Sequence, residues 1–95
     1  MTFEDFRQSL SADHPSAFSV HLLALWYDGR GDWNAAHDLI NDMDGEKAAW
    51  IHAYLHRKEG DQGNARYWYD RAGKTPSRLS LEEEWKEIVR AFLPK

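Results

Sequence analysis

The 95-residue chain contains no cysteine, so it can form neither a disulfide framework nor a zinc site built on thiolates. It also lacks a surplus of positive charge, because 12 Lys and Arg stand against 16 Asp and Glu. Phosphate-rich partners need a basic surface, so duplex nucleic acid and anionic membranes are disfavoured. No apolar run approaches the roughly 18 residues of a membrane span, and the acid-bearing stretch "MTFEDFRQSL" is unlike a signal peptide. These absences predict a cytoplasmic protein.

The motifs of common catalytic sites are missing as well. The sequence has no nucleophile elbow and no glycine-rich phosphate loop. Ser77 and Ser80 are explained as turn and cap residues, and the acids Asp42, Asp44 and Glu82–Glu84 stand where helices begin. We therefore expect neither an enzyme nor a cofactor.

What the chain does have is helical periodicity. Apolar residues recur at spacings of three and four, and no segment shows the sustained two-residue alternation of a strand. A length of 95 residues suits one small domain, and the five Trp add buried area to its modest core. The sequence thus predicts a single all-α domain of six helices, carried by "TFEDFRQSL", "PSAFSVHLLALWYD", "WNAAHDLINDM", "GEKAAWIHAYLHRKE", "QGNARYWYDR" and "LEEEWKEIVRAFL".

Cap residues predict where these helices begin and end. Pro15 suits the first turn of the second helix. Asp32 is expected to cap the third helix, and either Asp42 or Asp44 the fourth, which Gly60 ends. The other boundaries are expected at Thr2 with Asp5, at Asp61, at Gly73 with Pro76, and at the capping box of Ser80 with Glu83.

The middle of the chain repeats itself. Shifting the sequence by the 29 positions that separate Gly31 from Gly60 superposes both Gly-Asp pairs and aligns Ala24 with Ala53 and Ala36 with Ala65. Small residues at these places allow paired helices to approach closely. The repeat therefore predicts two similar helix–turn–helix units.

These units resemble tetratricopeptide (TPR) repeats and their Sel-type relatives. The residues at the pattern's positions are Val20, Leu23, Ala24, Tyr27, Ala36, Ile40 and Met43 in the first unit, and Ala49, His52, Ala53, His56, Ala65, Tyr69 and Ala72 in the second. The resemblance implies a stack of two helix hairpins, residues 15–44 and 45–76. An N-terminal helix and loop at 1–14 and a C-terminal helix at 77–95 would cap it. The 29-residue repeat is shorter than the usual 34, which requires a tight turn between units.

His52 and His56 depart from this pattern, which places a large apolar residue and a Tyr there. They stand four residues apart on one helix, so they share a face, and we expect that face to look toward Arg66 and Tyr69. One interpretation is a pocket for a small anion, or for a metal held by two imidazoles and a carboxylate. In the alternatives the histidines bond within the core or are half exposed on a rotated helix. No third ligand has a fixed spacing, so we predict no metal site.

The inner face of such a stack comes from the first helix of each unit. It would present Trp50, Tyr54 and Arg57 from the second unit and His21 from the first, and these include the residue types of binding hot spots. The composition predicts a groove for a peptide or helix partner. Alternatively, a flanking amphipathic helix lies in the groove as an internal cap.

The resemblance implies a non-catalytic protein-interaction module, an adaptor or an assembly subunit. Trp68 and Tyr67 lie off the packing seam of the fifth helix, so they cover a flanking helix, contact a protein partner or close a homodimer. The alternative function is a small-ligand or metal-binding protein with its polar site at His52 and His56.

Overall fold

A computed structural model describes residues 1–94, which form six α-helices and contain no strand. The prediction of an all-α fold with six helices is confirmed. The helices are α1 (Phe3–Ser9), α2 (Val20–Gly29), α3 (Trp33–Ile40), α4 (Glu46–Glu59), α5 (Gln62–Ala72) and α6 (Leu81–Phe92). Among them, no helix is both long enough and apolar enough to span a bilayer.

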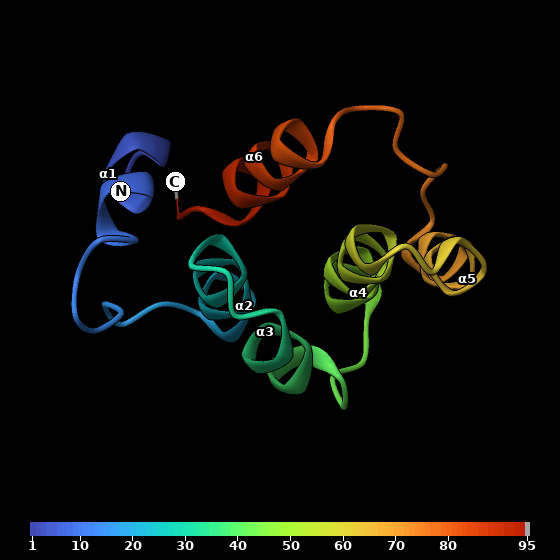
Figure 1. Ribbon diagram of the computed structural model, residues 1–95, viewed down its shortest axis with the longest axis horizontal. Helices are drawn as coiled ribbons and strands as arrows, with labels where there is room; N and C mark the ends of the chain where they lie inside the picture. Colours follow the sequence, from blue (N-terminus) through green and yellow to red (C-terminus); the bar gives the residue numbers. More distant parts are fainter. Residues whose placement is uncertain (95) are drawn as a thin grey trace.

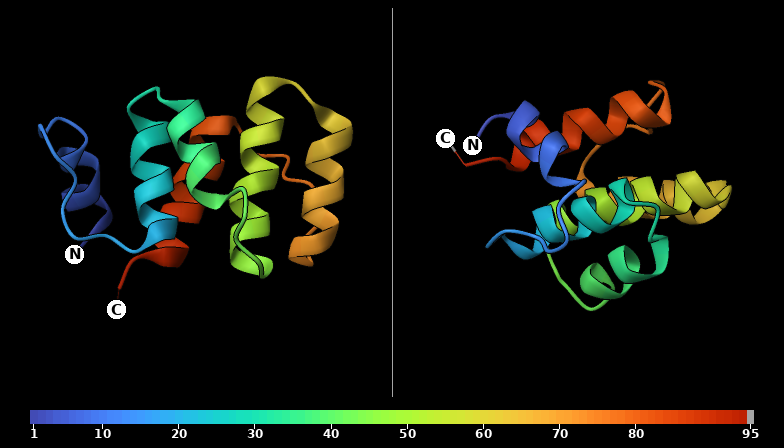
Figure 2. Two further views of the ribbon diagram at one scale, coloured as in Figure 1. Left: turned by 90° about the horizontal axis from the view of Figure 1, so that it is seen from below. Right: turned by 60° about the vertical axis from the view of Figure 1, so that its left-hand side comes forward.

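Helices α2 and α3 form one hairpin and α4 and α5 a second, and the two hairpins stand side by side (Figures 1 and 2). Both turns contain a glycine with positive φ, 83° at Gly31 and 90° at Gly60, a conformation that side-chain-bearing residues rarely adopt. The small residues shared by the two units are buried, which allows close helix packing: Ala24, Ala36, Ala53 and Ala65.

Helix α6 crosses the face formed by α2 and α4, and α1 packs beside it (Figure 1). The buried residues of α6 are Glu84, Trp85, Ile88 and Val89, and Trp85 Nε1 donates to the Leu25 carbonyl oxygen at 3.1 Å. The fit is tight, because a Cβ at Gly29 would lie only 2.8 Å from Cζ2 of Trp85. The inner face was predicted either to form an open groove or to be covered by a flanking helix. The structure shows the second arrangement, with α6 as the covering helix.

Most of the predicted caps are present. The carboxylate of Asp32 accepts from the Ala35 N–H at 3.0 Å, and that of Asp61 accepts from the Asn64 N–H at 3.2 Å. Thr2 and Asp5 form a reciprocal capping box, Ser80 accepts from the Glu83 N–H, and Gly60 and Gly73 end their helices in the left-handed conformation. The sequence could predict these caps because each cap residue bonds only to the first or last turn of its own helix.

Two predicted helix starts are wrong. Pro15 lies in the loop before α2, and Ser19 caps that helix because its hydroxyl accepts from the first turn. Neither Asp42 nor Asp44 caps α4. Gly45, with a φ of 101°, is the residue at which the chain turns into that helix, and it makes no side-chain cap.

Candidate functional site

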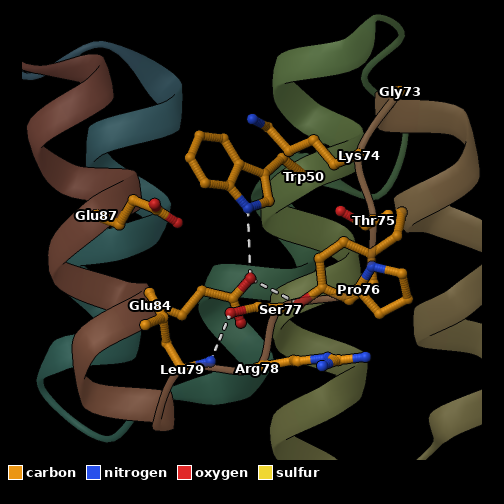
Figure 3. Close-up of a pocket in the computed structure, with 11 residues that line it drawn as sticks. Trp50, Gly73, Lys74, Thr75, Pro76, Ser77, Arg78, Leu79, Glu84 and Glu87 are labelled. Atoms are coloured by element: carbon orange, nitrogen blue, oxygen red, sulfur yellow. Dashed lines mark hydrogen bonds between the residues drawn. The ribbon is translucent and has the colours of Figure 1, made fainter.

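A fully buried carboxylate, Glu84, anchors α6 in the inner face. Its Oε1 accepts from Arg57 Nη1 at 2.8 Å, and its Oε2 accepts from the Tyr69 hydroxyl at 2.6 Å and from Trp50 Nε1 at 3.4 Å. Figure 3 shows the indole of Trp50 and the carboxylate of Glu84 facing each other. Both line a pocket with a volume of about 950 Å³. Arg57 also donates to the Leu79 carbonyl oxygen. A paired and bonded charge of this kind is the form in which a carboxylate tolerates burial.

The inner face is therefore not an open groove, which corrects the prediction that Trp50, Tyr54 and Arg57 face a partner. Trp50 is 8% exposed and Tyr54 is 2% exposed, because α6 covers them. Arg57 is committed to Glu84. His21 is half-buried on the same face, with its ring centroid 5.4 Å from that of Phe92 in α6.

A second buried carboxylate joins α2 to α4. Asp28 Oδ1 accepts from Lys58 Nζ at 2.9 Å, while Asp28 Oδ2 is buried and has no hydrogen-bond partner. Burial, followed by the charge of Asp28, raises the pKa of Tyr54. Both acids thus tie the helices together within the fold.

Arg66 and Tyr69 do not share a pocket with His52 and His56, so that prediction is wrong. The Tyr69 hydroxyl points to Glu84, and burial followed by this bond raises the pKa of Tyr69, which keeps the proton on the donor. Arg66 lines a small hollow with Tyr69 on that side of α5. The residue of α5 that stacks on His52 is Trp68.

Instead, the structure brings three histidines together. His37 of α3 meets His52 and His56 of α4, and one ring nitrogen from each lies within 4.8 Å of the other two. His37 Nε2 and His52 Nε2 are 3.0 Å apart. The rings of His52 and His56 stack with their centroids 4.8 Å apart. The i, i+4 spacing on α4 fixes this stacked pair, and the α3–α4 packing adds the third imidazole.

Two tryptophans wall the cluster. Trp68 stacks on His52 with a centroid separation of 3.9 Å and an interplanar angle of 18°. Trp33 stacks on His37 at 4.9 Å and 8°. Trp33 is itself held against α4, because its Nε1 donates to the Leu55 carbonyl oxygen at 2.8 Å. These contacts limit the directions in which His37 and His52 can turn.

A carboxylate supports the third ring from behind. His56 Nδ1 lies 2.5 Å from Glu59 Oε2, which acts as a hydrogen-bond acceptor when ionised. The proton of a neutral His56 therefore resides on Nδ1, and Nε2 keeps its lone pair. Metal-binding histidines usually donate their other ring N–H to a carboxylate or carbonyl oxygen in this way.

His52, the most buried histidine of the cluster, is uncharged at neutral pH. Burial, followed by the neighbouring His56 and His37, lowers the pKa of His52 from 6.5 to about 4. Burial is also the main cause that lowers the pKa of His37. Neutral imidazole is the form that coordinates metal ions, and the lowered pKa values keep His52 and His37 in that form at neutral pH.

The sequence-based interpretation found His52 and His56 but missed His37 and Trp33. The one signal for His37 is its position next to Ala36, a small packing residue, and four residues after Trp33. No spacing rule links it to α4, because the contact arises between two hairpins.

No protein-family model, curated protein or solved structure matches the chain. The resemblance to tetratricopeptide repeats stays a prediction.

Proposed function

We propose that the protein binds a divalent transition-metal ion of the zinc class through His37, His52 and His56. The observation that carries the proposal is the convergence of three imidazole nitrogens, each within 4.8 Å of the others, from two separate helices. Imidazole is a preferred ligand of zinc and of neighbouring transition metals. The sequence analysis gave metal binding at His52 and His56 as an alternative function. The proposal keeps these two ligands and adds His37 as the third.

One of the nitrogen–nitrogen distances already suits such an ion. Zn–N bonds of 2.0–2.1 Å in a tetrahedral site place ligand nitrogens about 3.3 Å apart. His37 Nε2 and His52 Nε2 are already 3.0 Å apart, and the nitrogen of His56 lies within 4.8 Å of both. Glu59 already accepts from the outer nitrogen of His56. To complete the set, the nitrogen of His56 has to come closer to the other two.

Calorimetric titration of Zn²⁺ into chelator-stripped protein tests the proposal. We expect one saturable binding event per chain, and we expect its affinity to fall at least tenfold in each of His37→Gln and His52→Gln. His14 is an exposed loop histidine far from the cluster in sequence, so His14→Gln is the matched control and should bind as the original chain does. Absence of saturable binding, or full binding in both cluster variants, would overturn the proposal.

A second candidate function is protein binding through α5, as an adaptor or assembly subunit. Tyr67 is 51% exposed, and the Arg71 guanidinium lies 5.7 Å from the centre of its ring and 5.5 Å from that of Trp68. Tyr, Trp and Arg are the side chains that dominate binding hot spots. This moves the predicted partner surface from the covered inner face to Tyr67, Trp68 and Arg71.

A photo-crosslinking residue at position 67 tests this second candidate. We expect a discrete cross-linked product with a protein partner or a second copy of the chain, with none from the control position Glu87 on α6. Equal cross-linking from both positions, or none from either, would remove the α5 surface as the contact.

A further inference from the structure

We infer that a second site, on the other side of α4 from the histidine cluster, binds a small uncharged aromatic molecule that donates a hydrogen bond to Asp28. Tyr54 of α4 lines this site and stands two residues from both His52 and His56, so it projects about 200° around the helix from them. None of the three clustered histidines lines the pocket. The inference therefore does not depend on the proposed metal site.

The site is a pocket of about 340 Å³ where the end of α2 meets α4 and α6, beside α1. Leu10, Leu81 and the ring of Trp85 supply apolar walls. Gly29 also lines the pocket, and a Cβ there would lie 2.8 Å from Cζ2 of Trp85 and 3.0 Å from Cδ2 of Leu10. The missing side chain thus lets two of the walls lie close to the end of α2. The pocket offers mainly apolar surface to the body of a ligand.

One oxygen of Asp28 is the polar group that the fold leaves unbonded. Asp28 is 2% exposed, and its Oδ1 accepts from Lys58 Nζ at 2.9 Å. In the described part of the chain, its Oδ2 is the one buried side-chain polar atom without a hydrogen-bond partner. Buried polar atoms are nearly always bonded, because an unbonded one has lost its water without a replacement. Since Asp28 lines the pocket, a donor group of a ligand completes its bonding.

The charges around the pocket balance, which favours an uncharged ligand. The three cations that line it are each paired with an acid: Lys58 with Asp28 at 2.9 Å, Lys86 with Glu82 at 3.6 Å, and Arg7 with Glu4 at 2.5 Å. Near these walls, Arg57 is paired with Glu84, and Arg30 donates to two carbonyl oxygens. An ionised ligand would give up its hydration without meeting an unpaired opposite charge among the lining residues.

The size of the pocket fits one substituted ring. Benzene fills an apolar cavity of about 150 Å³, and ligand pockets range from about 300 to 1,000 Å³. The pocket at Asp28, about 340 Å³, therefore accommodates a ring with short substituents. Trp85 provides an aromatic neighbour for that ring. Phenols, which combine a neutral ring with one O–H donor, are the simplest molecules of the required class.

The test compares para-cresol with para-methylanisole, which has the same ring but no donor. Each is titrated into the protein as purified, and proton–nitrogen correlation spectra follow the backbone N–H of Gly29 and the indole N–H of Trp85. We expect saturable shifts at both signals. The dissociation constant of para-cresol should be about tenfold lower, because a hydrogen bond to a charged group contributes about that factor.

Asp28→Asn tests the acceptor itself. The amide oxygen of Asn can still accept from Lys58, which leaves the NH₂ group, a donor, in the place of Oδ2. The preference for para-cresol over para-methylanisole should therefore disappear in this variant. Glu87→Gln is the matched control, because Glu87 is on α6 but does not line the pocket, and it should keep the full preference.

The comparison in the original chain decides the matter even where Asp28→Asn does not fold. Equal affinities of the two molecules would overturn the inference. A preference that persists in Asp28→Asn, or shifts that centre outside the pocket, would overturn it as well. Absence of saturable shifts would also refute it and leave Oδ2 to water. None of these results bears on zinc binding, because the pocket and the histidine cluster share no residue.

Discussion

Acid should destabilise the metal-free protein through His52. The pKa of this imidazole is 6.5 in an unfolded chain, whereas burial, followed by His56 and His37, lowers it to about 4 in the fold. The unfolded chain therefore binds a proton in a pH range where the folded protein does not. The stability that the neutral ring contributes is complete above pH 6.5 and is lost as the pH falls toward 4.

The two pKa values set the size of the effect. Linkage gives a loss of at most about 2 kcal/mol between pH 8 and pH 5, and at most about 3 kcal/mol below pH 4. A small domain has a total stability of about 5–15 kcal/mol, so the loss at pH 5 is a substantial fraction of it. For a domain of this size, the same loss lowers the melting temperature by about 8–16 °C.

Urea denaturation in the presence of a chelator, followed by tryptophan fluorescence at pH 8, 6 and 5, measures the effect. His52→Gln removes the titrating ring, so its free energy of unfolding should fall less between pH 8 and pH 5 than that of the original chain. His14→Gln should follow the original chain, because its histidine is exposed in a loop. Equal losses in the original chain and in His52→Gln would refute the reasoning.

Three further substitutions test the packing of α5 and α6. Glu84→Ala leaves Arg57 without its buried partner and should cost about 3–5 kcal/mol in the free energy of unfolding measured with urea; a cost near zero would contradict the anchoring role of Glu84. Gly29→Ala places a Cβ 2.8 Å from the Trp85 ring and should lower stability by about 1–3 kcal/mol, unless α6 shifts, which near-ultraviolet circular dichroism would reveal. Tyr67→Ala should change the free energy of unfolding little, because the ring is exposed. A loss of more than about 1 kcal/mol in that free energy would show that Tyr67 belongs to the core.

Much of the helical architecture could be predicted because it depends on local rules. The Gly-Asp turns and the buried alanines were all visible as a repeat in the sequence. In the first turn of α6, a position at the start of a helix accounts for the exposed acids Glu82 and Glu83 but not for the buried Glu84. Glu84 stands three residues after Leu81 and four before Ile88, and so lies on the apolar stripe that packs into the inner face. This spacing carried the signal for the buried anchor.

The histidine cluster was only partly predictable. The i, i+4 spacing of His52 and His56 indicated a shared face, but the neighbour of that face depends on how α3 and α5 turn about their axes. The side chain of Tyr69 points toward Glu84, and Trp68 is the α5 residue that lies against His52. His37 belongs to the other hairpin. Contacts between hairpins depend on how the helices pack, so no fixed sequence spacing predicts them.

The most direct test of the three-histidine metal site is the X-ray absorption spectrum of the zinc-loaded protein at the zinc edge. The proposed site predicts three imidazole nitrogens at about 2.0–2.1 Å and one further light ligand from solution, with one imidazole fewer in His37→Gln. A shell made only of oxygen, or one whose imidazole count does not change in His37→Gln, would contradict it.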